Sequence, residues 1–177
     1  MTGVDISKKM LQRASEKTNN PNVSYIHAAI EDVQFKDESF DVVISSLAFH
    51  YIESFRPLAK NICHWLKPGG QFIFSVEHPI FTSRNEQDWY YDQEGNRLYW
   101  PVDHYQSEGI RHTSFLSEPV MKYHRTVSSY VNILISAGFG ITAIKEPTPT
   151  EEMLATDPNM KDENRRPMFM IVAANKL

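Results

Sequence analysis

The chain has 177 residues, 41% hydrophobic and 23% charged, with a formal net charge of −4, a composition typical of one globular domain. This charge provides no basic surface for nucleic acid, and no apolar run reaches the roughly 18 residues of a membrane span. The single cysteine, Cys63, excludes an internal disulfide and is expected to pack in the core. We therefore expect a cytoplasmic protein without nucleic-acid or membrane partners.

The first predicted elements are a strand, a helix and a second strand. Residues 2–6 look like the end of a strand, and Ser7 can cap a helix with an apolar stripe that begins at Met10. Residues 23–28 alternate between apolar and polar side chains, which is typical of a strand, and a loop then leads to Ser39.

The most informative stretch runs from Phe40 to Val76. An apolar, β-rich run ends at Ser45-Ser46, and an amphipathic helix follows it. The helix ends at Pro68-Gly69-Gly70, which leads into a second apolar run. This pattern predicts a strand–helix–strand unit in a parallel sheet. Because ligands bind beyond the carboxyl ends of the strands in such sheets, residues 45–51 are predicted to line a small-molecule pocket.

The regular alternation breaks down between residues 77 and 123. Trp89-Tyr90-Tyr91 and Leu98-Tyr99-Trp100 flank residues 92–96, which have the composition of a hairpin turn. We expect residues 79–123 to form a cap that is inserted into the sheet domain.

The last third of the chain begins with its clearest helical stripe, over residues 127–135, which Gly138 can close as a C-cap. Strand-like runs follow over residues 139–146 and 168–174. Residues 147–167 between them are rich in proline and charge, so they are predicted to form a long loop.

Four of these segments occur in an order that is informative by itself. They are Gly3-Val4-Asp5-Ile6-Ser7, Ala29-Ile30-Glu31-Asp32, Phe40-Asp41-Val42-Val43 and Leu66-Lys67-Pro68-Gly69-Gly70. In this order the chain resembles class I S-adenosylmethionine-dependent methyltransferases of the small-molecule type, over nearly its whole length. The resemblance implies a Rossmann-like α/β sheet, a single domain over residues 1–177, S-adenosyl-L-methionine as cofactor and a small-molecule methyl acceptor.

The resemblance also implies which residues contact the cofactor. The carboxylate of Asp5 would accept hydrogen bonds from both ribose hydroxyls. The other contacts would come from Ile6 on the adenine face, from Ala29, Ile30, Glu31 and Asp32 along the adenine edge, and from Ser45, Ser46 and Leu47 beneath the methionine part. Asp5 could instead be an acid that favours the start of a helix, and the acids at 31 and 32 could be solvated loop residues.

Three residues that follow predicted strands are the candidates for catalysis: His50, Glu77 and His78. One of them would act as a base if the acceptor must lose a proton. His50 could equally cap or pack at the start of the following helix. No histidine or cysteine pair has the spacing of metal ligands, so no metal is expected.

The predicted cap carries seven acidic and four basic residues, a net charge of −3. Aromatic side chains among acids favour a neutral or cationic acceptor, and the alternative is a hydrophobic cap that only completes the core. Arg165-Arg166, in the predicted long loop, could meet an acidic substrate or the cofactor carboxylate, or could simply be solvated.

The glycine-rich loop after the first strand of this family has no counterpart in the sequence, because Gly69-Gly70 and Gly138-Phe139-Gly140 lie on other connections. We therefore expect an N-terminally truncated domain, in doubt as an enzyme, whose exposed sheet is covered by a second copy in a homodimer or by a rearranged strand. Two alternatives remain: a non-catalytic remnant that binds a partner, and an NAD-dependent oxidoreductase. The final helix and two strands fit the methyltransferase better.

Overall fold

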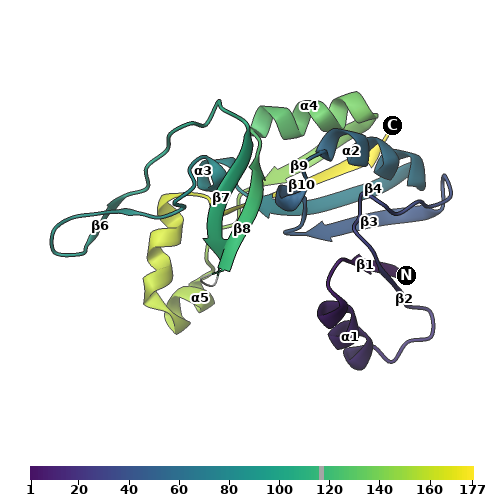
Figure 1. Ribbon diagram of the computed structural model, residues 1–177, viewed down its shortest axis with the longest axis horizontal. Helices are drawn as coiled ribbons and strands as arrows, with labels where there is room; N and C mark the ends of the chain where they lie inside the picture. Colours follow the sequence, from purple (N-terminus) through teal and green to yellow (C-terminus); the bar gives the residue numbers. More distant parts are fainter. Residues whose placement is uncertain (116–117) are drawn as a thin grey trace. The chain divides into compact units, whose positions relative to one another are not determined.

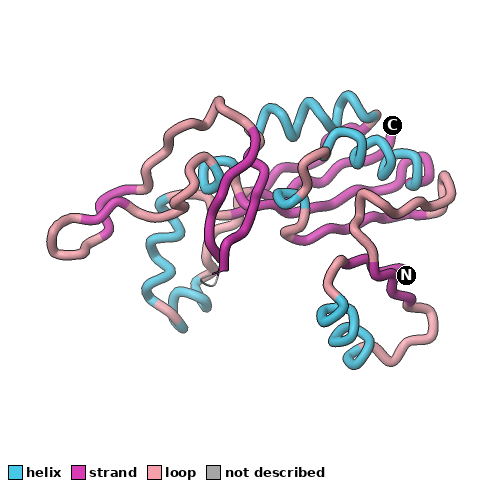
Figure 2. Tube along the Cα trace, in the orientation of Figure 1, coloured by secondary structure: helices cyan, strands magenta, loops and turns pink. Residues whose placement is uncertain are grey.

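The structure is a computed structural model that describes residues 1–115 and 118–177. It divides into two compact units, Met1–Asp37 and Glu38–Leu177. Figures 1 and 2 show the elements of both units. Within the described residues, no helix combines the length and the apolar character that crossing a bilayer requires.

The first unit is a parallel strand pair joined by one helix. Strand β1 (Thr2–Asp5) pairs with β2 (Ser24–His27), and α1 (Lys8–Lys17) connects them. The Ser7 hydroxyl accepts a hydrogen bond from the Met10 N–H at 3.3 Å, which confirms the predicted helix cap. Because the two strands are parallel, their carboxyl ends meet at one edge, where Asp5 lies opposite His27.

The second unit contains a mixed four-stranded sheet. Its strands lie in the order β3 (Phe40–Ser46), β4 (Leu66–Glu77), β10 (Phe169–Lys176) and β9 (Phe139–Lys145). Strands β3 and β4 are parallel, whereas β10 runs antiparallel to both of its neighbours. The predicted parallel unit and the predicted pair of closing strands are therefore confirmed.

Two helices cover one face of this sheet. Helices α2 (Phe55–Trp65) and α4 (Val127–Ala137) contact each other as well as the sheet, and lie on the same side of it (Figure 1). Beneath them, alternate side chains of β4 are buried. Two of these, Phe72 and Phe74, belong to an aromatic core in which neighbouring ring centroids lie 4.9–5.8 Å apart. The rings of this core are Phe49, Phe55, Phe72, Phe74, Phe139 and Tyr130. Cys63 is buried in α2, as predicted.

The Pro-Gly-Gly segment lies inside β4 rather than before it. The pairing of β3 with β4 shifts between Phe40, which pairs with Leu66, and Val42, which pairs with Gln71, so residues 67–70 bulge out of the ladder. A Cβ on Gly70 would lie 2.8 Å from the Lys67 carbonyl oxygen and 3.2 Å from the Asp41 carbonyl oxygen. Only glycine fits this close approach of two backbones.

The inserted segment between β4 and α4 contains a short helix and two hairpins. Helix α3 (Pro79–Thr82) is followed by the predicted hairpin of β5 (Tyr90–Tyr91) and β6 (Arg97–Tyr99). A second hairpin, of β7 (Gly109–Phe115) and β8 (Glu118–His124), was not predicted from the sequence.

The β7–β8 hairpin buries charged side chains and exposes apolar ones, so its strands are hard to recognise in the sequence. The cationic side chains of Arg111 and Lys122 lie opposite each other on the ladder and are buried, as is His124. Ile110 and Met121, on the other face, are exposed. Alternation of apolar residues therefore gives the wrong buried face for these strands.

The prediction of an irregular loop over residues 147–167 is wrong. Helix α5 (Glu151–Thr156) and the 3₁₀ helix η2 (Pro158–Arg165) occupy most of it. The Thr150 hydroxyl caps α5 by accepting the Met153 N–H at 3.3 Å, and two acids in the first turn favour the helix dipole.

Candidate functional site

In the first unit, the residues predicted to bind a cofactor lie together at the carboxyl ends of β1 and β2. The Asp5 carboxylate accepts a hydrogen bond from the Ser7 N–H at 2.7 Å, which fixes its orientation. The Asp5 carbonyl accepts the Ala28 N–H at 3.2 Å, so the segment 29–32 begins beside it. Asp5 is half-buried, whereas the neighbouring Ile6 is exposed.

In the second unit, strand β3 ends in a strained turn. The end of the strand and this turn contain Ser45, Ser46 and Leu47, the residues predicted to contact the methionine part of the cofactor. The Leu47 N–H donates to both the hydroxyl and the carbonyl oxygen of Ser75, at 3.1 and 3.0 Å. Leu47 has a φ of +51°, a left-handed conformation that costs a non-glycine residue roughly 1–2 kcal/mol. Residues with strained backbone conformations are common at functional sites, and Leu47 directly follows Ser45 and Ser46.

His50 lies in the 3₁₀ helix η1 (Phe49–Tyr51), and its ring is 2% exposed. Its Nδ1 accepts a hydrogen bond from the Glu77 N–H at 3.3 Å. Burial, and after it the positive charges of Lys122 and Arg125, lower the pKa of His50 from 6.5 to about 3. The ring is therefore neutral near pH 7, and because Nδ1 is an acceptor, the proton resides on Nε2.

Glu77, the last residue of β4, is held by a buried lysine from β8. The Lys122 Nζ lies 2.7 and 2.8 Å from the two Glu77 carboxylate oxygens and 2.9 Å from the Gln87 side-chain oxygen. Lys122 is 1% exposed. The Thr113 hydroxyl donates to the same Gln87 oxygen at 3.0 Å. This network fastens the inserted hairpin to the carboxyl end of the sheet.

The third predicted catalytic residue, His78, also has polar partners at both ring nitrogens. Its Nδ1 accepts the Ile80 N–H at 3.1 Å and caps α3, and its Nε2 lies 2.8 Å from a Glu146 carboxylate oxygen. The His78 N–H donates to the Met168 carbonyl at 2.8 Å. Burial lowers the pKa of His78, and Glu146 opposes this effect.

A buried arginine holds η1, and with it His50, in place. The Arg125 guanidinium donates to the backbone oxygens of Ile52, Glu53, Phe49 and Tyr123, the second of these at 2.6 Å. These partners accept hydrogen bonds from both terminal nitrogens of the guanidinium but do not neutralise its charge.

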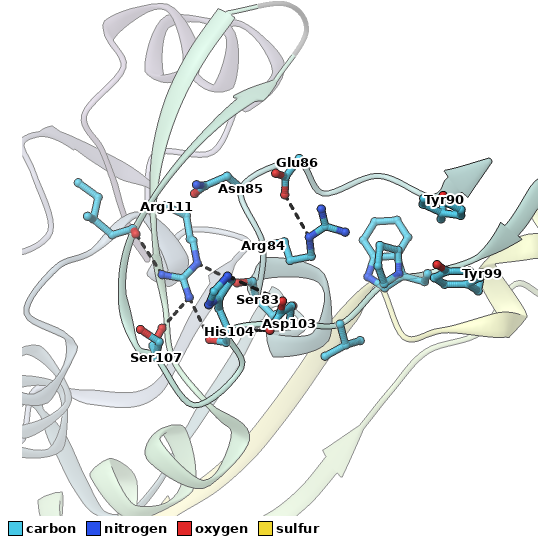
Figure 3. A pocket seen from close by; sticks show the side chains of 14 residues that line it. Ser83, Arg84, Asn85, Glu86, Tyr90, Tyr99, Asp103, His104, Ser107 and Arg111 are labelled. Carbon is cyan, nitrogen blue, oxygen red and sulfur yellow. Dashed lines mark hydrogen bonds and ion pairs between the residues drawn. The ribbon is translucent and has the colours of Figure 1, made fainter. Parts of the chain in front are cut away.

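The insert contains a depression of about 740 Å³ (Figure 3). The stacked rings of Tyr90 and Tyr99 lie at one end of it, and Arg111 lies at the other. The Arg111 guanidinium donates to four backbone oxygens, those of Ser83, His104, Ser107 and Ile110, at 2.6–3.3 Å. None of the predicted catalytic residues lines this depression.

Arg165 and Arg166 pack on the aromatic residues of the insert. The Arg166 guanidinium carbon lies 4.3 Å from the centroid of Trp100 and 5.0 Å from that of Phe81. The Arg165 guanidinium carbon lies 4.6 Å from the centroid of Trp89. Cation–π contacts of this kind fasten the end of η2 to the insert.

Sequence reasoning missed Lys122, Gln87 and Arg125 as members of the site. The available signal was weak: Lys122 lies two residues from His124 in a strand-like run, so both side chains share one face. Thr82, a partner of His124, and Glu77, a partner of Lys122, lie 42 and 45 residues away in the chain.

Comparisons with known proteins point to one family. A family model described as "Methyltransferase domain" matches residues 1–74. The structure is similar to that of an S-adenosylmethionine-dependent methyltransferase from Listeria monocytogenes, with 48% identity, a TM-score of 0.95, and coverage of 99% of this chain and 79% of the other. It is also similar to one from Mesorhizobium loti, with 39% identity, a TM-score of 0.91, and coverage of 99% and 80%. An uncharacterized protein of Haemophilus influenzae is 36% identical over 186 residues, 99% of this chain and 71% of that protein.

Replacing Lys122 by methionine tests the buried pair. Lys122→Met leaves the Glu77 carboxylate without its counter-charge in a largely buried position, so we expect a loss of about 3 kcal/mol in the free energy of unfolding. Urea unfolding at neutral pH measures the loss. The matched control is Lys67→Met, which breaks a 2.7 Å pair with Asp41 whose side chains are 48% and 78% exposed, and which should cost less than about 1 kcal/mol. Equal losses from the two substitutions would contradict this account.

Proposed function

Because the chain belongs to the S-adenosylmethionine-dependent methyltransferases, we propose that it transfers a methyl group from S-adenosyl-L-methionine to a small-molecule acceptor. S-adenosyl-L-methionine is the cofactor of this family. The observation that supports the proposal most is the oriented, half-buried Asp5 carboxylate at the carboxyl ends of two parallel strands. Such an acid is suited to accept hydrogen bonds from a ribose diol.

The family resemblance assigns proposed cofactor contacts within each unit. In the first unit, Asp5 binds the ribose, Ile6 packs on the adenine face, and Ala29, Ile30, Glu31 and Asp32 lie along the adenine edge. In the second unit, Ser45, Ser46 and Leu47 contact the methionine part. The strained turn at Leu47 supports this assignment, because a hydrogen bond to Ser75 holds the Leu47 backbone at the carboxyl end of β3.

The proposed acceptor site adjoins the carboxyl ends of β3 and β4, where His50, Glu77 and His78 gather. Methyl transfer from a sulfonium is an in-line displacement, so the enzyme gains most from alignment and from exclusion of water. The buried network of Glu77, Lys122 and Gln87 supports such a role, because it holds these groups rigidly under the insert.

We also propose that a second copy of the chain covers the exposed side of β3. Within the described residues, β3 pairs only with β4, so it forms one edge of its sheet. Ile44 is 72% exposed and Val42 is 44% exposed on this edge strand. An apolar edge strand is a template for pairing with another chain, and a homodimer would remove it from water.

Substitution of Asp5 tests the proposed cofactor site. Asp5→Asn keeps a side-chain oxygen for the Ser7 N–H but removes the charge that binds the ribose hydroxyls. We expect S-adenosylhomocysteine to bind about tenfold or more weakly, with unchanged thermal stability. Isothermal titration calorimetry measures the affinity, with Asp37→Asn, an exposed acid of the same unit, as control. NAD, the cofactor of the alternative oxidoreductase, should not bind. Unchanged affinity in Asp5→Asn would overturn the assignment.

Light scattering after size-exclusion chromatography tests the proposed dimer. The unsubstituted chain should have the mass of two copies, and Ile44→Glu should have the mass of one, because a buried carboxylate opposes association. Thr142→Glu, at an exposed position of the opposite edge strand β9, is the control and should stay dimeric. A monomeric unsubstituted chain would contradict the proposal.

A further inference from the structure

A second, smaller depression lies between the insert and residues 165–167, at the end of η2. It has a volume of about 300 Å³, and most of its wall consists of ring and apolar side chains, among them Ile80, Trp89, Tyr99, Trp100 and Val102. Within the described residues, its charged lining side chains are those of Arg165 and Arg166. We call it the indole pocket. A cavity of about 150 Å³ suffices for benzene, so the indole pocket has room for a molecule of one or two rings.

The two indole rings on the wall of this pocket are held in fixed orientations. The ring centroids of Trp89 and Trp100 lie 5.4 Å apart, and the ring planes are inclined by 86°. Trp100 stacks on Phe81 at 4.9 Å, and its Nε1–H donates to the Ile80 carbonyl at 3.3 Å. Trp89 is 7% exposed. Because these rings are already ordered, a flat ligand that packs on them loses little affinity to the ordering of side chains.

The arginine and indole groups of the pocket offer hydrogen-bond donors and no acceptors. The two Nη atoms of Arg166 lie 2.6 and 3.4 Å from the Glu163 carboxylate oxygens. The Arg166 Nε is buried and has no hydrogen-bond partner in the described part of the chain. Because an unsatisfied buried donor is unfavourable, a ligand that brings an acceptor oxygen to this guanidinium gains affinity.

Net charge does not select the ligand of the indole pocket. Three guanidinium carbons lie within 5.7 Å of the Trp89 ring centroid, those of Arg97, Arg165 and Arg166. Three carboxylates pair with these groups or accept the Trp89 N–H, those of Asp88, Asp162 and Glu163. The formal charges of the six groups cancel, so the selection comes from ring packing and from hydrogen-bond donors.

The larger depression of Figure 3 shares one wall with the indole pocket but has a different chemistry. Tyr99, Trp100 and Val102 line both, whereas Trp89 lines only the indole pocket. Carboxylates of the insert line the larger depression, so it offers acceptors as well as donors. A signal from Trp89 therefore reports the indole pocket alone.

We propose that the indole pocket binds a small molecule that has a flat aromatic ring and a carbonyl or carboxylate oxygen. The ring packs against Trp89 and Trp100, and the oxygen accepts a hydrogen bond from the arginines. A ligand whose polar group only donates, such as an ammonium, finds no carboxylate on the described wall. This inference goes beyond the proposed function, because none of the residues proposed to contact the cofactor lines the pocket.

Nitrogen-15 NMR of the indole N–H groups tests the pocket without any cofactor. The chain has three tryptophans, and the third, Trp65, is buried in α2 and serves as internal control. The full chain is titrated with benzamide and benzoate, and the signals are assigned with Trp89→Phe and Trp100→Phe. We expect both compounds to shift the Trp89 and Trp100 signals saturably, with half-saturation at about 5 mM or below, and to leave the Trp65 signal unchanged.

Two comparison compounds separate the ring from the acceptor oxygen. Cyclohexanecarboxamide retains the carbonyl of benzamide without the flat ring, and benzylamine retains the ring with a polar group that only donates. We expect each to bind at least about fivefold more weakly than benzamide.

A substitution that fills the indole pocket tests its location. Val102 is 50% exposed on the wall, so Val102→Phe adds a ring there without disturbing the core. We expect benzamide to bind at least about tenfold more weakly, with an unchanged thermal midpoint. Leu98→Phe is the matched control, since Leu98 is 47% exposed and does not line the pocket, and it should bind benzamide as the unsubstituted chain does.

Four results would overturn the inference. They are the absence of a saturable Trp89 shift, an equal shift of Trp65, affinity for either comparison compound equal to that for benzamide, and undiminished binding to Val102→Phe. A shift of Trp100 without Trp89 counts as the first of these, because it places the ligand in the larger depression. Each readout is independent of S-adenosyl-L-methionine, so the proposed function and this inference stand or fail separately.

Discussion

A buried lysine must find a counter-charge, and in this chain Lys122 finds it at the last residue of β4. The pair with Glu77 joins a hairpin of the insert to the carboxyl end of the sheet, and Gln87 and Thr113 complete the hydrogen bonds of the network. Buried ion pairs contribute little net stability compared with apolar packing, but a broken pair is costly. The interaction thus selects one placement of the hairpin, because any other placement leaves a charge buried alone.

The same constraint decides what the neighbouring side chains can do. Glu77 uses its carboxylate on Lys122 and its backbone N–H on His50, so His50 is held neutral with its proton on Nε2. Arg125 holds η1 and the two residues after it through the backbone oxygens of Phe49, Ile52 and Glu53. Groups that looked like bases in the sequence are therefore arranged as positioning groups, which suits a displacement that depends on alignment more than on proton transfer.

The elements of the sheet could be predicted because their signals are local. Phe72, Phe74 and Val76 alternate along β4, and the apolar face of α2 recurs at helical spacing, so both patterns point to the core that the structure contains. Asp5 could be placed at a strand end for the same reason. The β7–β8 hairpin could not, because its buried face carries Arg111 and Lys122, and a period-two pattern does not distinguish a buried polar face from an exposed one. The pairing of Glu77 with Lys122 spans 45 residues and has no local signature.

The role of His50 as a positioning group depends most directly on the protonation state of its ring. Nitrogen-15 NMR of the histidine rings, followed as the pH falls from about 8 to 4 and assigned with His50→Gln, reads both tautomer and charge. We predict that His50 keeps its proton on Nε2 and does not titrate until the pH approaches its lowered pKa of about 3. Titration of the ring near its ordinary value of 6.5, or a proton on Nδ1, would contradict the account.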